Sequence, residues 1–311
     1  MRDWSSLGPG CFDERMKFPN FILIGANKGG TSSFYNYLGQ HPQILMSDIK
    51  EPTFFFYNDM SGAQPVVKVD RNEPKWRNWR PVTTLDDYMN LFADTPAGVK
   101  AAGEASTAYL ANPFCAERIA KFNPAMKIIA ILREPVSRAF SSYLMYVRLG
   151  HEKDSFSNVV EKELSGKKSD LPQGQQYLRL GYYADSISEY QRVFGKENVK
   201  IYFNEELKNH PQELFYDVFQ FLSVDISFEP DVREKFNVNE NVSMRGAMQD
   251  FIYRAGNKSG ISKLLPSSVQ KKLRGELFLN DKMKAKLHEL YRDDVIKLQF
   301  IAGKDLSHWL K

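Results

Sequence analysis

Residues 21 to 35 constrain the fold most, because an apolar run, a glycine-rich turn and a row of hydroxyl residues follow one another directly. The run at residues 21 to 24 reads Phe-Ile-Leu-Ile, which is typical of a parallel strand buried on both faces. Three glycines follow: Gly25, Gly29 and Gly30. Thr31 and Ser32 then open a helix-like stretch, whose N-terminal N–H groups and dipole favour an anion. The segment predicts a strand, a loop and a helix that seat a phosphate or sulfate.

Lys28 adds a positive charge inside this loop. In the nucleotide P-loop, G-x-x-x-x-G-K-[ST], the lysine follows a glycine and precedes the hydroxyl residue. Here the lysine precedes Gly29 and Gly30, and no Gly-Lys-Thr follows. We interpret the loop as an anion site, and the alternative is a tight strand-to-helix turn with a solvated lysine.

A second segment predicts another anion site. Residues 127 to 132 form a strand-like run that should end at Arg133, since Pro135 fits the first turn of a helix. A magnesium-nucleotide enzyme would typically end such a strand in an aspartate. Arg133, with Ser141 two turns on, instead suits an anionic group bound without metal. The alternative is an arginine that satisfies helix or loop carbonyl groups.

Taken in order, these segments resemble the sulfotransferases that use 3′-phosphoadenosine 5′-phosphosulfate (PAPS), in the branch of the heparan-sulfate enzymes and many stand-alone bacterial enzymes. The similarity runs from about residue 19 to 309. It includes Lys-Gly-Gly-Thr-Ser-Ser at 28 to 33, Lys-Glu-Pro-Thr-Phe-Phe at 50 to 55 and Gly-Glu-Ala-Ser-Thr-Ala-Tyr-Leu at 103 to 110. The chain departs from the pattern at Thr107, where proline is common. It also departs at Thr53 and Phe56, where heparan-type members often carry a histidine and an acidic residue.

The resemblance implies a metal-independent donor site. Its residues would be Lys28, Gly29, Gly30, Thr31, Ser32, Arg133, Ser141, Arg245 and Gly246. The first five would hold the 5′-phosphosulfate, Arg133 and Ser141 the 3′-phosphate, and the last two a later loop near that phosphate and the adenine.

The resemblance also makes Glu51 the general base, with Lys28 as a second catalytic residue that offsets charge on the leaving phosphate. A carboxylate within hydrogen-bond reach of an acceptor hydroxyl can take its proton during attack. Pro52 and the aromatic residues 54 to 57 suggest a partly apolar wall beside it. The alternative is an ordinary solvated pair of Lys50 and Glu51 on a loop.

For the acceptor we expect a small organic alcohol or amine, such as a secondary metabolite. The insertion at about residues 59 to 88 carries Trp76 and Trp79 among basic residues, a mix able to cover a ring-shaped ligand. The tryptophans could equally pack the loop onto the core, and a heparan-like glycan is the alternative acceptor. Glu104 is interpreted as structural or as an aid to acceptor placement, and Ser106 as a neighbouring candidate.

Strands at about 21 to 25, 127 to 132 and 199 to 203, with helical stretches between them, predict an α/β fold. Its mostly parallel central sheet would be flanked by helices in three layers, like a P-loop protein. We expect one sulfotransferase domain over residues 1 to 311, with an N-terminal extension at about 1 to 18. Ligands of such sheets lie beyond the carboxyl ends of the strands, where both anion motifs fall.

Composition is consistent with this reading. The 311 residues are 42% hydrophobic and carry a net charge of +4, which suits a polyanionic nucleotide and does not by itself argue for nucleic acid. No apolar run approaches the roughly 18 residues of a membrane span, and charges in residues 1 to 20 argue against a signal-peptide core. Two cysteines form no disulfide framework, so a cytoplasmic location is expected. The histidines and cysteines show no metal-ligand spacing.

Two rival functions remain at this point. An ATP-dependent P-loop kinase would need magnesium, which the displaced lysine and missing aspartate oppose. A non-catalytic nucleotide-binding protein would keep the glycine loop but have no use for Glu51. The sequence leaves open the oligomeric state and the role of the basic stretch at residues 258 to 274.

Overall fold

The computed structural model describes residues 18–57, 81–148, 151–166, 176–234, 279 and 281–311. The chain divides into two compact units, each considered by itself. The first comprises residues 1–133 and 185–236, and the second comprises residues 134–184 and 237–311. A single domain with insertions stays a prediction.

A five-stranded parallel sheet forms the centre of the first unit, in the order β2-β3-β1-β4-β5. The strands are β1 Phe21–Gly25, β2 Ile44–Met46, β3 Ala101–Ala105, β4 Lys127–Leu132 and β5 Val199–Phe203. The three strands that the sequence predicts are confirmed as β1, β4 and β5. Strands β2 and β3 are additional. Every residue of β1 and β3 is buried, as expected for strands covered on both faces.

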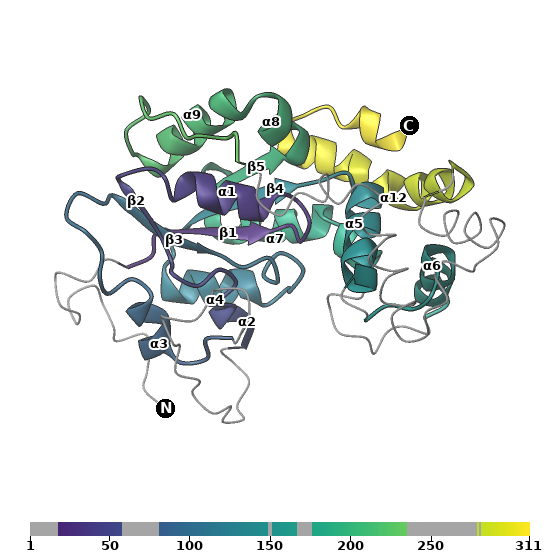
Figure 1. Ribbon diagram of the computed structural model, residues 1–311, viewed down its shortest axis with the longest axis horizontal. Coiled ribbons are helices and arrows are strands. Elements are labelled where there is room, and N and C mark those ends of the chain that lie inside the picture. Colours follow the sequence, from purple (N-terminus) through teal and green to yellow (C-terminus); the bar gives the residue numbers. More distant parts are fainter. Residues whose placement is uncertain (1–17, 58–80, 149–150, 167–175, 235–278, 280) are drawn as a thin grey trace, which may run out of the picture. The chain divides into compact units, whose positions relative to one another are not determined.

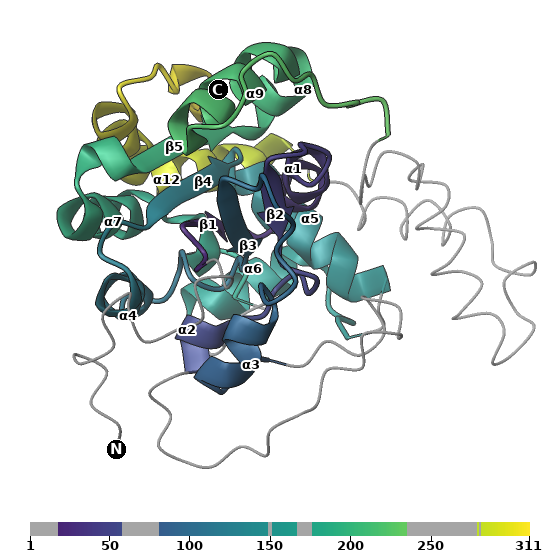
Figure 2. The same cartoon turned by 90° about the vertical axis from the view of Figure 1, so that its left-hand side faces the viewer.

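Helices cover both faces of this sheet. In both views α1, α8 and α9 lie on one face, and α4 and α7 lie on the other (Figures 1 and 2). The helices of this unit are α1 Thr31–Leu38, α2 Phe54–Tyr57, α3 Leu85–Asn90, α4 Cys115–Phe122, α7 Ala184–Phe194, the short η4 Lys196–Asn198, α8 Asn204–Asn209 and α9 Pro211–Leu222. Helix α7 begins at the last residue of the second unit. The predicted three-layer α/β architecture is confirmed.

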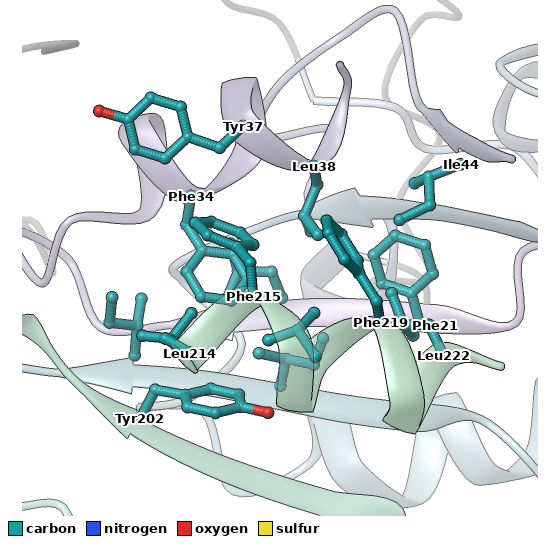
Figure 3. Close-up of a cluster of buried hydrophobic side chains, with 14 of the residues drawn as sticks. Phe21, Phe34, Tyr37, Leu38, Ile44, Tyr202, Leu214, Phe215, Phe219 and Leu222 are labelled. Carbon is teal, nitrogen blue, oxygen red and sulfur yellow. The ribbon is translucent and has the colours of Figure 1, made fainter. Parts of the chain in front are cut away.

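An aromatic cluster joins α1 and α9 to the sheet (Figure 3). The Phe34 ring lies 5.2 Å from that of Phe215 on α9 and 5.9 Å from that of Tyr202 on β5, measured between centroids. Phe34 and Leu38 lie on one face of α1 because they are four residues apart, and both are fully buried. Burying each large apolar side chain contributes about 1.5–3 kcal/mol, so this cluster holds α1 firmly behind the loop that precedes it.

The described part of the second unit is helical. It contains α5 Pro135–Arg148, α6 Phe156–Leu164, η3 Arg179–Gly181, α12 Asp281–Ala302 and η6 Ser307–Leu310. As predicted, α5 begins at Pro135, and the Glu134 carboxylate accepts the N–H groups of Val136 and Ser137 at 2.7 Å each. None of the helices that the structure describes has the length and apolar character needed to cross a membrane.

Candidate active site

The loop after β1 is folded tightly against β4. The N–H of Ala26 donates to the carbonyl of Ile131 at 2.7 Å, and the N–H of Gly29 donates to that of Ala26 at 2.8 Å. A Cβ on Gly29 would lie 2.3 Å from the Ile131 oxygen, so a side chain at this position cannot be accommodated without movement of the backbone. Lys28 adopts a left-handed conformation with φ 66°. Position 29 therefore requires glycine, because the backbone of the loop closely approaches the neighbouring strand β4.

Two side chains support this loop from neighbouring strand ends. Asn204, which directly follows β5, is buried and donates from Nδ2 to the Gly29 carbonyl at 2.8 Å. Arg133, which directly follows β4, donates from Nη1 to the Lys28 carbonyl at 3.4 Å. Sequence reasoning missed Asn204. Its position after a predicted strand, at the same sheet edge as the glycine loop, was the signal that could have identified it.

Helix α1 begins where the loop ends. Its N-cap is Gly30, with φ 109°, which has no side chain to cap the helix, and the first turn carries no acidic residue. The positive end of the helix dipole is thus not neutralised by an acidic side chain of its own first turn. Thr31 is buried and Ser32 is half-buried at this end. The predicted residues 28 to 32 lie together in one anion-type loop, and their contact with a donor remains a prediction.

The Glu51 carboxylate is held at the end of β3. Its Oε2 accepts the Thr107 N–H at 2.7 Å, and the Thr107 hydroxyl lies 3.1 Å from both carboxylate oxygens. The Lys50 Nζ lies 2.8 Å from Oε1, and each of these two side chains is 23% exposed. The Lys50–Glu51 pair considered from the sequence does form. The same carboxylate is also fixed by Thr107, so its position is set by more than a solvated ion pair.

The backbone around Glu51 is unusual and well anchored. Glu51 and Thr53 have left-handed φ values of 64° and 54°, a conformation that costs a non-glycine residue roughly 1–2 kcal/mol. The Glu51 N–H donates to the Ala105 carbonyl at 2.8 Å, and the Thr53 N–H donates to the Ser106 hydroxyl at 3.0 Å. The last residue of β3 and the residue that follows it therefore hold the strained loop in place.

Glu104 and Ser106 lie beneath this loop. Both are fully buried, and the Ser106 hydroxyl donates to Glu104 Oε2 at 2.7 Å. Burial raises the pKa of Glu104 to about 8, and the nearby Glu51 charge acts in the same direction. The hydroxyls of Ser106 and Tyr109 and the charge of Lys50 act against this increase. This burial favours the structural role for Glu104 over direct acceptor contact.

Several predicted site residues fall elsewhere. Ser141 is buried on α5 in the second unit, so its joint action with Arg133 stays a prediction. Trp76, Trp79, Arg245 and Gly246 lie outside the described residues. The same holds for most of the insertion and for the basic stretch at residues 258 to 274.

The sheet order brings the remaining candidates to one edge. Strand β1 lies between β3 and β4, and all three run parallel. The glycine loop follows β1, Thr107 with its bound Glu51 follows β3, and Arg133 follows β4. The glycine loop, a carboxylate and a guanidinium therefore lie beyond the carboxyl ends of three adjacent strands, the usual place for ligands in such folds.

Comparison with known proteins identifies the family. A model of the sulfotransferase domain matches residues 18–295, most of the chain. The chain belongs to the sulfotransferase family. This membership supports neither the kinase nor the non-catalytic alternative that the sequence left open.

Curated relatives of this sulfotransferase carry names of carbohydrate-modifying enzymes. It is 26% identical to mouse carbohydrate sulfotransferase 15 over 259 residues, covering 66% of this chain and 44% of the mouse protein. It is 28% identical over 215 residues to the human bifunctional heparan sulfate N-deacetylase/N-sulfotransferase 3, covering 67% of this chain and 22% of the human protein. The sulfotransferase thus spans less than half the length of these relatives.

A solved bacterial structure extends the likeness to the whole fold. The crystal structure of a sulfotransferase from Alicyclobacillus acidocaldarius superposes with a TM-score of 0.71 at 29% identity. The match covers 95% of this sulfotransferase and 100% of that chain.

Proposed function

We propose that this sulfotransferase moves the sulfuryl group of PAPS to a hydroxyl or amine of an acceptor, with Glu51 as general base. The observation that carries the proposal is the fixed, partly exposed Glu51 carboxylate at the end of β3, beside the strand that leads into the glycine loop. A carboxylate held by three donor groups has a defined orientation toward an acceptor proton. An ordinary surface glutamate would not need such anchoring.

The residues of the glycine loop fit a phosphosulfate group. Gly29 has no room for a Cβ, the α1 N-terminus lacks an acidic side chain, and Lys28 supplies a positive charge within the loop. Arg133 at the end of β4 provides a guanidinium for a second phosphate, and we assign Ser141 to the same group. Recognition of a 3′-phosphate would separate PAPS from ATP and ADP.

The chemistry follows from these groups. The acceptor oxygen or nitrogen forms a bond to sulfur while the bond from sulfur to the bridging phosphate oxygen breaks. Glu51 takes the acceptor proton, and Lys28 offsets the negative charge left on the phosphate of the departing 3′-phosphoadenosine 5′-phosphate (PAP). Such in-line transfers depend mainly on positioning and electrostatic stabilisation.

Two acceptor classes are candidates. A small organic alcohol or amine is the proposal from the sequence, based on Trp76 and Trp79. A carbohydrate is the second candidate, supported by the names of the relatives. Sulfation of pooled small hydroxyl and amine compounds, compared with desulfated heparin and chondroitin, separates them. Transfer to the polysaccharides alone would reject the small acceptor.

The donor assignment is tested by thermal stabilisation. We expect PAP without magnesium to raise the melting temperature much more than ADP does, since a ligand at a hundred times its Kd stabilises by roughly 2.7 kcal/mol. Arg133→Ala should abolish the difference between the two nucleotides. Equal stabilisation by ADP and PAP would contradict the 3′-phosphate site.

The base assignment is tested by Glu51→Gln. We expect kcat to fall roughly 100- to 10,000-fold while PAP stabilisation is retained, because the side chain acts on the acceptor proton. Glu213→Gln, at an 85% exposed side chain on α9, is the matched control and should keep wild-type kcat. Wild-type turnover in Glu51→Gln would refute the role of the base.

A further inference from the structure

A buried row of hydrogen bonds connects the core to the loop that carries Glu51. The Thr53 N–H donates to the Ser106 hydroxyl at 3.0 Å, and that hydroxyl donates to Glu104 Oε2 at 2.7 Å. Ser106 is itself fixed through its own N–H, which donates to the Leu23 carbonyl of β1 at 3.0 Å. In this row the loop N–H donates to the hydroxyl, and the hydroxyl donates to the carboxyl oxygen.

The loop needs this support. Thr53 is a buried, β-branched residue in a left-handed conformation, which persists only where the surroundings hold it. Its N–H lies two residues from Glu51, so its anchor also limits where the Glu51 carboxylate can move. Thr107 orients the Glu51 carboxylate, and Ser106 holds the backbone N–H of Thr53.

The surroundings of Glu104 disfavour a negative charge. The whole side chain is fully buried, and no donor meets Oε1 with hydrogen-bond geometry among the described residues, although the Tyr109 hydroxyl is near enough to the carboxyl to lower its pKa. An ionised carboxylate with one such bare oxygen in the core would carry a large desolvation cost. Burial raises the pKa of Glu104 to about 8, which agrees with the geometry.

Other titratable groups near Glu104 do not supply a compensating charge. Four tyrosines and one cysteine lie close enough for its charge to raise their pKa values, and burial raises all five further: Tyr35, Tyr88, Tyr109, Tyr190 and Cys115. They stay neutral at physiological pH. Lys50 favours the charged form of Glu104 and Glu51 opposes it. On α4, the Arg118 guanidinium is bound to the carbonyls of Phe55 and Phe56 at 3.0 Å each.

We propose that Glu104 is a positioning residue for the proposed base: its neutral carboxyl group accepts the Ser106 hydroxyl, which in turn holds the Thr53 N–H and keeps Glu51 in place. The expected effect on turnover rests on the proposed role of Glu51. The hydrogen-bonded row itself does not depend on that role. Ionisation of Glu104 would place a second buried negative charge near the Glu51 carboxylate, and the repulsion between the two charges would displace the loop that carries Glu51. Loop order should then decline at alkaline pH, and turnover with it.

The experiment measures the loop and turnover separately. Hydrogen exchange at residues 50 to 57 is compared in wild type, Ser106→Ala, Glu104→Gln and Tyr88→Phe. Tyr88→Phe is the control, because it removes a buried hydroxyl near Glu104 that has no hydrogen-bond partner in the described structure. We expect faster exchange in Ser106→Ala only, since Gln keeps a neutral acceptor for Ser106.

The same variants are then assayed for kcat across pH. Ser106→Ala should lower kcat roughly 10- to 100-fold, as expected for a misplaced catalytic group, with PAP stabilisation intact and wild-type kcat in Tyr88→Phe. Wild type should lose activity as pH rises through about 8, and Glu104→Gln should lack this decline. Infrared spectroscopy supplies a third readout: a carboxylic-acid carbonyl band that is present in wild type at neutral pH and absent from Glu104→Gln.

Three results would overturn the inference. They are unchanged loop exchange in Ser106→Ala, loop exchange as fast in Glu104→Gln as in Ser106→Ala, or no acid band at neutral pH. Faster exchange in Ser106→Ala with unchanged kcat would also overturn the positioning role and leave the row a purely structural one, whereas the role of Glu51 as base is tested separately by Glu51→Gln. Failure of the proposed function and failure of this inference are therefore distinguishable.

Discussion

Replacing Glu104 by Gln should change how the stability of the protein depends on pH. In the folded protein burial raises the pKa of Glu104 from 4.5 to about 8. In the unfolded chain the carboxyl is in water and releases its proton at an ordinary acidic pH. Between these two values the folded state holds one more proton than the unfolded state. The contribution of Glu104 to the free energy of unfolding therefore falls as pH rises through this window.

The magnitude follows from the two values. The difference between about 8 and 4.5 is about 3.5 units, and at 1.36 kcal/mol for each unit it corresponds to an upper limit of about 5 kcal/mol. The stabilising contribution is complete below the unfolded pKa and is lost as pH rises through the folded one. Gln cannot ionise, so Glu104→Gln lacks this contribution to the pH dependence, while the other titrating groups are common to both proteins.

The assay is urea unfolding of wild type and Glu104→Gln at a series of pH values from acidic to above pH 8. We expect wild type to lose stability relative to the variant by several kcal/mol across the series, with equal m-values. Glu229→Gln, at an exposed position, should follow the wild-type profile. A constant stability difference between wild type and Glu104→Gln at every pH would refute a buried, neutral Glu104.

Two further predictions concern the glycine loop. Gly29→Ala should abolish PAP stabilisation and lower the melting temperature, because its Cβ would lie 2.3 Å from the Ile131 oxygen. Gly39→Ala is the control, since its Cβ would meet no atom closer than 3.5 Å. A comparable loss in Gly39→Ala would contradict the steric argument. Asn204→Ala should cost roughly 1–3 kcal/mol in urea unfolding and weaken PAP binding, because the Gly29 carbonyl loses its buried partner. Unchanged PAP affinity in Asn204→Ala would show that the loop keeps its shape without this bond.

Local chemistry explains why much of the fold could be predicted. The strands β1, β4 and β5 are mostly apolar runs, and Gly25 and Gly30 in the turn after β1 have positive φ values, which is a local reason for glycine. Likewise Pro135 marks the start of α5 from its own fixed φ. Residue types suited to an anion also follow from the sequence, which is why residues 28 to 32 and Arg133 are candidates, whereas Glu51 is a candidate through the resemblance to the family.

Strand β3 shows why local pattern was insufficient elsewhere. Its sequence Ala-Ala-Gly-Glu-Ala contains few residues with strand propensity, and its one charged residue argues against burial. It is a central strand because β1 and β2 supply its hydrogen-bond partners. The neighbouring strand also explains Gly103. A Cβ at this position would lie 2.4 Å from the Phe21 oxygen of β1, so the close approach of the two strands requires glycine.

The sequence alone therefore determined the residue types of the site and the local elements that carry them. The tertiary structure decided which of those residues meet: Thr107 holds Glu51 across 56 residues, and Asn204 holds Gly29 across 175 residues. Those contacts depend on the order of strands in the sheet, which places the ends of β1, β3, β4 and β5 at one edge. The proton on Glu104 is a tertiary property in the same sense, because the same carboxyl in water would be ionised at neutral pH, and only its burial in the folded core raises its pKa.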